Sequence, residues 1–300
     1  MITSRQNLGL TLGFIGVCMF AGTLPATRIA VQGFDPWFLT AARAAIAGFA
    51  SVLLLLMTRR RIPPRSLWLE IAVAAICTVI GFPLFAALAM RTVPAAHGGV
   101  VLGILPLATA VAAAVLAHER PSRGFWLLTL CGAGIVLLFV MRSNENTAFA
   151  AGDLFLLGMV VSGALGYTWS GRLTAHMPGW EVISWQVAIF LPAAALATIL
   201  LWPKALGGVP ASAWAGLAYV GLISQYMAFF VFNAAMAMAG IARVGQLTLL
   251  QPFAVVILAW PINGEPIRLE TVVFATAVVV TVLLAQRTQV ARRLVPEAHG

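Results

Sequence analysis

Two stretches decide the fold: GGVVLGILPLATAVAAAVLAHERPS at residues 98–122 and VGQLTLLQPFAVVILAWPINGEPIR at residues 244–268. A shift of 146 residues superposes them and matches three pairs of residues: Gly99 with Gly245, Pro106 with Pro252, and Glu119 with Glu265. Alanine matches carry little weight in so alanine-rich a chain. A proline and a glutamate thirteen residues apart that recur at one shift are hard to attribute to chance. The pattern therefore predicts an internal repeat. A weaker match near the start of each half, at a shift of 144 residues, aligns Gly22 with Gly166 and Arg28 with Arg172.

The composition assigns this repeat to a membrane. Of the 300 residues, 61% are hydrophobic and 9% are charged, and the mean hydropathy is +0.98. Soluble domains are about 45–50% apolar and about 25% charged. This chain therefore has too few polar residues to cover the surface of a soluble domain. A soluble enzyme, a disordered chain and a nucleic-acid-binding domain are excluded. The net charge of +9 then indicates membrane orientation, because basic residues collect in cytoplasmic loops.

The apolar runs are long enough to cross a bilayer, which takes about 20 residues in a helix. They predict an all-α integral membrane protein with ten transmembrane helices. The expected spans are residues 8–30, 36–57, 67–90, 96–117, 124–141, 153–173, 180–202, 212–236, 242–262 and 271–286.

Five spans in each repeat place the second half upside down relative to the first. The predicted halves are residues 1–146 and residues 147–300, the latter with a short cytoplasmic tail. Transporters of this inverted-repeat plan bind substrate near the midplane, between the halves.

The arginines predict the sidedness. With the N-terminus in the cytoplasm, eleven arginines fall in inside segments and four basic residues in outside segments, so both termini are expected to be cytoplasmic. Arg28, Arg43 and Arg243 lie within or at the edge of spans. The simplest interpretation makes them orientation signals whose side chains reach the interface; they are also the chain's only candidates for cations in a cavity.

The two repeat stretches, with a proline in the fourth span of each half and a glutamate at its far end, resemble the drug/metabolite transporter superfamily and its ten-helix EamA-type branch. Within that branch the chain is most similar to YddG-like amino-acid exporters. The resemblance implies a multi-pass secondary transporter of the bacterial inner membrane with an aromatic residue of the sixth span at its site. Gly103-Ile104-Leu105 stands where those exporters carry extra aromatics, so a strictly aromatic substrate is not implied.

Polar and aromatic side chains at membrane depth tend to face a cavity or a partner helix. On this ground we expect eight residues to bind substrate: Thr23, Tyr167, Trp169, Gln225, Tyr226, Asn233, Gln246 and Gln251. Amides and a phenol could bind a zwitterion without a full countercharge, and an indole could stack on an apolar side chain. The alternative for each residue is packing or hydrogen bonding between helices.

Prolines inside spans remove a backbone hydrogen bond and make bending easier. Four of them are predicted hinges: Pro25, Pro83, Pro106 and Pro252. The alternative is an ordinary, static kink.

The sequence also predicts absences. No carboxylate falls mid-membrane, which argues against cation antiport of the small multidrug type. No pattern of a nucleophile with its base, of metal ligands or of a nucleotide-binding loop is present, so we expect no enzyme, no cofactor and no metal. The expected partners are a small-molecule substrate and membrane lipids, without nucleic acid, and a monomer suffices. The predicted function is alternating-access export of neutral or aromatic amino acids or related small metabolites. The alternatives are export of another small metabolite or drug, and a non-transporting membrane receptor.

Overall fold

The computed structural model describes residues 4–116, 122–143, 151–204, 208–239 and 247–287, and all regular structure in these ranges is helical. Seven helical segments there are long and apolar enough to cross a membrane, and three shorter apolar helices, at 126–142, 248–263 and 269–284, complete the ten. The prediction of an all-α membrane protein with ten transmembrane helices is confirmed.

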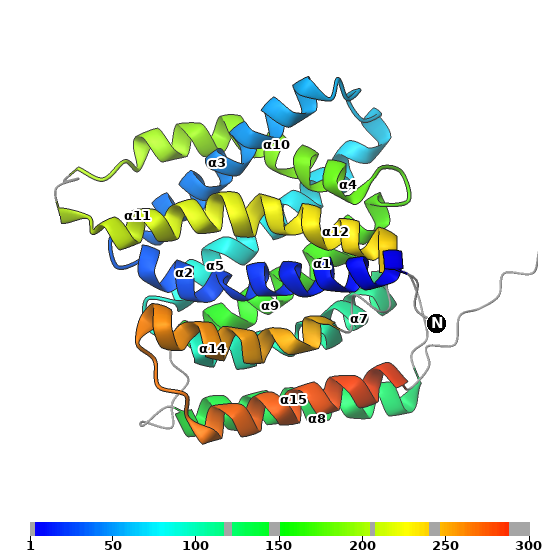
Figure 1. Ribbon diagram of the computed structural model, residues 1–300, viewed down its shortest axis with the longest axis vertical. Helices are drawn as coiled ribbons and strands as arrows, with labels where there is room; N and C mark the ends of the chain where they lie inside the picture. Colours follow the sequence, from blue (N-terminus) through cyan, green and yellow to red (C-terminus); the bar gives the residue numbers. More distant parts are fainter. Residues whose placement is uncertain (1–3, 117–121, 144–150, 205–207, 240–246, 288–300) are drawn as a thin grey trace, which may run out of the picture.

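Each half contributes five spans (Figure 1). Those of the first half are α1 (Ser4–Ala21) with α2 (Thr23–Ala30); α3 (Pro36–Met57); η1 (Arg65–Leu67), α4 (Trp68–Ala75), η2 (Ile76–Gly81) and α5 (Phe82–Ala89); α6 (Ala95–Leu102) with α7 (Leu105–Leu116); and α8 (Arg123–Ser143). Those of the second half are α9 (Ala151–Leu173); α10 (Gly179–Leu200); α11 (Ala211–Ala218), η4 (Tyr219–Met227) and α12 (Ala228–Ala239); η5 (Thr248–Leu250) with α14 (Gln251–Asn263); and α15 (Leu269–Arg287).

The helices pack as two inverted repeats require. The second span packs on the seventh (α3 on α10), the fourth on the ninth (α6 on α14) and the fifth on the tenth (α8 on α15), so each of these contacts joins two equivalent helices. The first span packs on the eighth (α1 on α12), and its mirror contact is the sixth on the third (α9 on α4 and α5). Because each of these contacts has its counterpart with the halves exchanged, the inverted repeat seen in the sequence is also the plan of the main helix contacts.

Glycine permits the close contact on which the fourth and ninth spans cross. A Cβ atom on Gly99 would lie 2.7 Å from Cγ1 of Val255, and one on Gly103 would lie 3.0 Å from Cγ of Pro252. Since real Cβ atoms do not approach so closely, any larger residue would push α6 away from α14. Gly99, Gly103 and Pro252 thus allow the fourth and ninth spans to cross in close contact.

Each of the four expected hinge prolines follows an interruption of the regular α-helix. Gly22 separates α1 from α2 ahead of Pro25, the π-helix η2 precedes Pro83, residues 103–104 interrupt the helix ahead of Pro106, and the 3-10 turn η5 precedes Pro252. A proline has no N–H to donate, so the preceding turn is free to rearrange. The eighth span carries a second π-helix, η4, which overlaps η2 at the repeat offset of 146 residues. Such π-turns often mark functional sites.

The chain begins and ends at the same end of the helix bundle. In Figure 1, α1 starts and α15 finishes at the right, which we call the terminal end, and the opposite end carries the connections from α2 to α3, from α5 to α6 and from α14 to α15. This is the arrangement that an even number of spans gives. The assignment of the terminal end to the cytoplasm stays a prediction.

Candidate functional site

A polar cavity lies between the two halves. Its thirteen lining residues come from seven of the ten spans: Phe20, Thr23, Leu24, Arg43, Thr78, Phe82, Leu102, Gly163, Tyr167, Ser224, Gln225, Phe229 and Gln251. Both π-helices contribute, η2 through Thr78 and η4 through Ser224 and Gln225. The irregular segments of the third and eighth spans therefore present polar groups to one common space.

The cavity is contracted. It leaves about 30 Å³ for the centres of water molecules, enough for about two waters. An amino acid or a comparable metabolite needs several times that volume, so the helices must separate before such a molecule can enter. The irregular turns ahead of the prolines lie in the spans that would have to move.

Four of the eight residues expected from the sequence to bind substrate line this cavity: Thr23, Tyr167, Gln225 and Gln251. Repeat symmetry relates much of the polar lining. Thr23 and Tyr167 are equivalent at the shift of 144 residues, and Thr78 and Ser224 at the shift of 146 residues. The Thr23 and Ser224 hydroxyls lie 2.7 Å apart and form a hydrogen bond, so the first and eighth spans meet through polar atoms.

A hydrogen-bonded chain fixes the other side of the lining. The Thr78 hydroxyl donates to Oε1 of Gln186 at 2.9 Å, and Nε2 of Gln186 donates to Oγ of Ser170 at 2.9 Å. The Gln225 amide in turn donates to the backbone oxygen of Thr78 at 3.4 Å. Tyr167 and Gln251, by contrast, have no hydrogen-bond partner for their side chains within the described ranges. These two polar groups are available to a bound molecule.

The other four expected residues lie elsewhere. Trp169 packs beside Leu173 at the terminal end, with the Arg172 guanidinium 4.6 Å from its ring centre. The buried Tyr226 hydroxyl hydrogen-bonds to Oγ of Ser184 at 2.9 Å. Asn233 lies against Gly179 at the start of α10, and Gln246 is outside the residues that the structure describes.

Arg43, for which the sequence left both an interfacial and a cavity position open, lines the cavity. It lies two turns into α3, it is 3% exposed, and its side chain lines the cavity rather than reaching an interface. Its Nε is fully buried, and no described residue forms a hydrogen bond or an ion pair with this side chain. The signal was present in the sequence, because Arg43 is the one charged residue of the second span. Its position two turns inside the span favours the cavity more strongly than its positive charge favours the interface.

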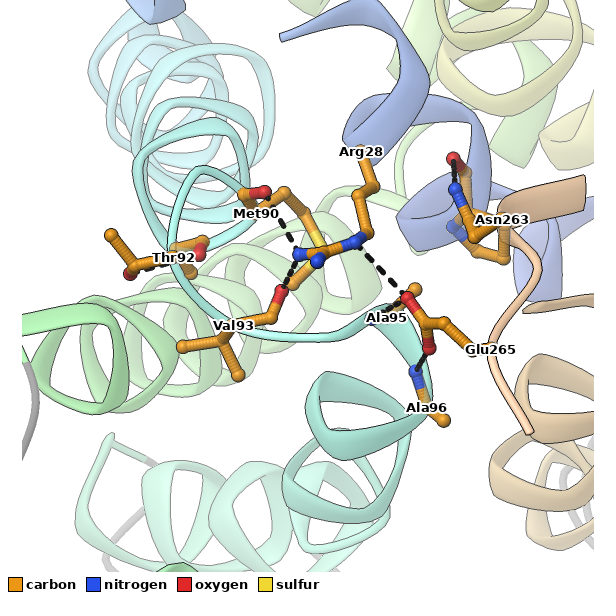
Figure 2. Close-up of polar contacts among 10 residues, drawn as sticks. Arg28, Met90, Thr92, Val93, Ala95, Ala96, Asn263 and Glu265 are labelled. Atoms are coloured by element: carbon orange, nitrogen blue, oxygen red, sulfur yellow. Dashed lines mark hydrogen bonds and ion pairs between the residues drawn. The ribbon is translucent and has the colours of Figure 1, made fainter. Parts of the chain in front are cut away.

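A second polar cluster, which we call the far-end junction, joins α2, α6 and the segment after α14 (Figure 2). Nε of Arg28 lies 3.1 Å from Oε1 of Glu265. The two carboxylate oxygens of Glu265 accept the backbone N–H groups of Ala95 and Ala96, each at 2.8 Å. A carboxylate at these free N–H groups caps α6 and interacts favourably with its dipole.

The backbone oxygens of the α5–α6 connection complete the coordination of Arg28. Its Nη1 donates to the backbone oxygens of Val93 and, at 3.3 Å, of Met90. Asn263 adds a bond from its side-chain amide to the backbone oxygen of Pro25 at 3.1 Å. The end of α14 is thus tied to the break region of the first span and to the start of the fourth span (Figure 2).

Gly264 lets Glu265 reach the far-end junction. Its φ of +69° lies in the left-handed region, where α14 ends and the chain reverses. Glycine adopts this conformation without strain. The turn at Gly264 therefore aims the carboxylate of Glu265; the repeat equivalent of this glutamate, Glu119, lies outside the described residues.

One further buried pair of polar side chains joins α6 to α9. Nε2 of His97, in the first turn of α6, is 2.9 Å from Oδ1 of Asp153 in the first turn of α9, and both residues are buried. No pattern along the chain indicates this pair, because 56 residues separate the two side chains. Together with the far-end junction it makes the start of α6 the most heavily bonded polar region of the described chain.

Ten apolar helices in two inverted halves around a polar cavity define a membrane transporter of the inverted-repeat class. Within the described residues, no group of three or more His, Cys, Asp or Glu side chains could hold a metal ion.

Comparison with known proteins identifies the family. The EamA-like transporter family matches the chain twice, over residues 7–141 and 150–286, and the chain belongs to this family. It is 40% identical to the uncharacterized transporter YdeK of Bacillus subtilis (strain 168), over 95% of this chain and 99% of YdeK. The uncharacterized transporter YwfM of the same organism is 27% identical over 81% of each chain.

A solved crystal structure shares the fold. It superposes with a TM-score of 0.62 over 94% of this chain and 99% of its own length, at 22% identity. The relatives are transporters, so the protein is a multi-pass membrane transporter. Their names do not state a substrate.

Proposed function

We propose that the protein is a secondary transporter that exports neutral or aromatic amino acids, or related small metabolites, across the inner membrane by alternating access. The observation that carries the proposal is the polar cavity between the inverted halves, lined by Thr23, Tyr167, Gln225 and Gln251. These groups offer hydroxyl and amide atoms to a molecule with both donors and acceptors, while Phe20, Phe82 and Phe229 supply an apolar wall.

The proposed mechanism uses the prolines. Pro106 and Pro252 occupy equivalent places in halves 1–146 and 147–300, each just after an interrupted turn. In inverted repeats the two halves exchange conformations, so one of these helices bends in the outward-open state and the other in the inward-open state. Pro25 and Pro83 are assigned the same role in the first and third spans.

The test is flux in reconstituted liposomes with a panel of radiolabelled neutral and aromatic amino acids, against protein-free liposomes. We expect counterflow of at least one of them. Substrate binding without flux would point to a receptor, and flux of unrelated drugs with none of the amino acids would favour the rival cargo.

Pro252→Ala and Pro106→Ala test the hinges in the same liposomes. Restoring the missing backbone hydrogen bond should favour one state and slow turnover severalfold, while substrate affinity changes little. If both variants, shown to be folded, transport at the wild-type rate, these prolines are packing features and the hinge mechanism is wrong.

Reporter fusions test the proposed sidedness. A fusion at Gly300 should report the cytoplasm, and one placed after Glu145 should report the outside. The reverse result would invert the direction in which the cavity opens and would remove the basis for export.

A further inference from the structure

We infer that Arg43 is the residue that recognises the cargo, and that the group it takes is a carboxylate. The inference rests on the proposed function in one respect: the central cavity must be the place where the cargo binds. It adds the chemical class of that cargo.

The first argument is the contrast with the other buried charges. Arginine stays charged near neutral pH, and a charge at membrane depth is costly, so such groups usually pair with another group. The buried His, Asp and Glu side chains of the described ranges each have a partner: His97 and Asp153 bond to one another, and Glu181 lies 3.7 Å from Arg60. Arg43 has none. A ligand is the missing partner.

The second argument is the charge of the cavity. Among the described residues that line it, Arg43 is the one charged side chain, and no acid faces it. A single guanidinium matches a single negative charge, and its planar pair of N–H donors fits the two oxygens of a carboxylate. A phosphate monoester carries about two charges at neutral pH and would leave one of them uncompensated in this lining.

The third argument comes from the repeat. The hydroxyls of the lining occur in equivalent pairs, Thr23 with Tyr167 and Thr78 with Ser224. The positions equivalent to Arg43 in the seventh span, at shifts of 144 and 146 residues, are Val187 and Ile189. The inverted fold therefore does not require a cation at this place. Arg43 breaks the symmetry of the site, as a residue selected for one end of an asymmetric molecule would.

The unpartnered groups near Arg43 describe the rest of that molecule. Tyr167 and Gln251 have free side-chain oxygens in the lining, and these can accept hydrogen bonds from an ammonium group. An amino acid would place its carboxylate on Arg43 and its ammonium on these oxygens. A simple monocarboxylate would use Arg43 alone.

The experiment measures thermal stabilisation of the purified protein by matched probes built on three side chains. Leucine, methionine and phenylalanine are each compared with the acid that lacks the amino group (4-methylpentanoate, 4-(methylthio)butanoate or 3-phenylpropanoate) and with the amino-acid amide that lacks the carboxylate. We expect acids of at least one series to stabilise the wild-type protein, and the amides to do so about ten- to a hundredfold more weakly.

Variants locate the effect. Arg43→Gln should lose the preference for acids over amides, and Arg43→Lys should keep part of it because the charge remains. Without ligand, Arg43→Gln should melt no lower than the wild type, since it removes an unpaired buried charge. The matched control is Arg142→Gln, at an arginine that is 72% exposed at the end of α8 and should leave binding unchanged.

The outcomes separate the two proposals. Equal binding of acids and amides, unchanged binding in Arg43→Gln, equal stabilisation by sodium chloride, or no stabilisation by any probe would each overturn the role of Arg43. Amino-acid flux with any of these results would leave the proposed function standing. Arg43-dependent binding of the acids without amino-acid flux would support the inference and overturn the proposed cargo.

Discussion

Two arginines of the first half, Arg28 and Arg43, show opposite solutions to the same physical problem. Arg28 is 27% exposed, yet a carboxylate and two backbone oxygens surround it at the far-end junction. Arg43 is 3% exposed and has no protein partner in the described ranges. Of the two guanidinium groups, the more deeply buried one, that of Arg43, is the one without a partner.

The difference separates structure from function. A cation that is paired within the protein holds helices together. Its removal leaves its partner groups buried and unpaired. A buried cation without a partner does not stabilise the ligand-free protein. Its presence is explained by a ligand that pairs with it. The far-end junction and the central cavity should therefore respond in opposite ways to mutation, the first in stability and the second in ligand affinity.

Glu265→Ala should give the largest loss of stability, because it would leave Arg28 without its carboxylate partner. The change removes the ion pair and both bonds that cap α6 at Ala95 and Ala96. Breaking a buried pair costs about 3–5 kcal/mol, and the partial exposure of Arg28 reduces this to about 2–3 kcal/mol. Chemical unfolding in detergent micelles measures the loss.

The control is Glu270→Ala, which removes an exposed pair with Arg142 at 3.1 Å and should cost at most about 1 kcal/mol. Equal losses in the two variants would mean that the far-end junction holds the helices no more firmly than a surface ion pair does.

Much of the fold could be predicted from the sequence, since hydropathy and the repeat act along the chain. The spans and the inverted repeat follow from runs of apolar residues and from matched prolines. The same information found Thr23, Tyr167, Gln225 and Gln251, because a polar group in mid-span has few places to go.

The remainder depends on how each helix is rotated about its axis. The sixth span, α9, has no distinct apolar face, so the sequence could not show that Tyr167 lines the cavity while Trp169 packs on its neighbours at the terminal end. Nor could it show that Glu265 would reach Arg28, or that His97 would meet Asp153, because these contacts join segments far apart in the chain. The position of Arg43 stayed open for a different reason: a rule about the average arginine was weighed for one that lies in mid-span.

Asp153→Asn should weaken the other buried pair on α6 by an intermediate amount. The amide keeps the shape and one acceptor oxygen for His97 but loses the charge, which should cost about 1–2 kcal/mol. The control is Asp35→Asn, at the start of α3, where the side chain caps the N–H of Trp37 at 2.9 Å. Asparagine caps helices as well as aspartate does, so no change is expected there. A loss at Asp35 as large as that at Asp153 would show that burial of the His97 pair adds nothing.

Gly264→Ala tests whether the turn that aims Glu265 is itself under constraint. A Cβ atom there would touch nothing within 4 Å, so the whole cost is the left-handed backbone, about 1 kcal/mol. The control is Gly134→Ala in α8, where a Cβ atom would also touch nothing within 4 Å. That change should stabilise the helix by up to about 1 kcal/mol. Opposite signs would confirm that the far-end junction depends on backbone conformation, and equal signs would contradict it.

The smallest expected effects come from two aromatic residues on the sixth span, and they sharpen the boundary of the cavity. Tyr167→Phe removes an unpartnered hydroxyl from the lining. It should weaken the binding of a transported amino acid by about two- to tenfold, the value of one hydrogen bond, and leave stability nearly unchanged. Trp169→Phe keeps an aromatic face beneath Arg172, whose guanidinium lies 4.6 Å from the ring centre, and removes the five-membered ring of the indole together with its N–H. It should change stability by at most about 0.5 kcal/mol, with affinity unaffected because Trp169 lies outside the lining.

Ligand titrations of both variants under one condition measure the difference. If Trp169→Phe weakens binding more than Tyr167→Phe does, the indole contacts the cargo, as the sequence alone suggests. The binding site would then extend beyond the cavity of this closed conformation toward the terminal end, and Arg43 would mark one edge of the site rather than its centre.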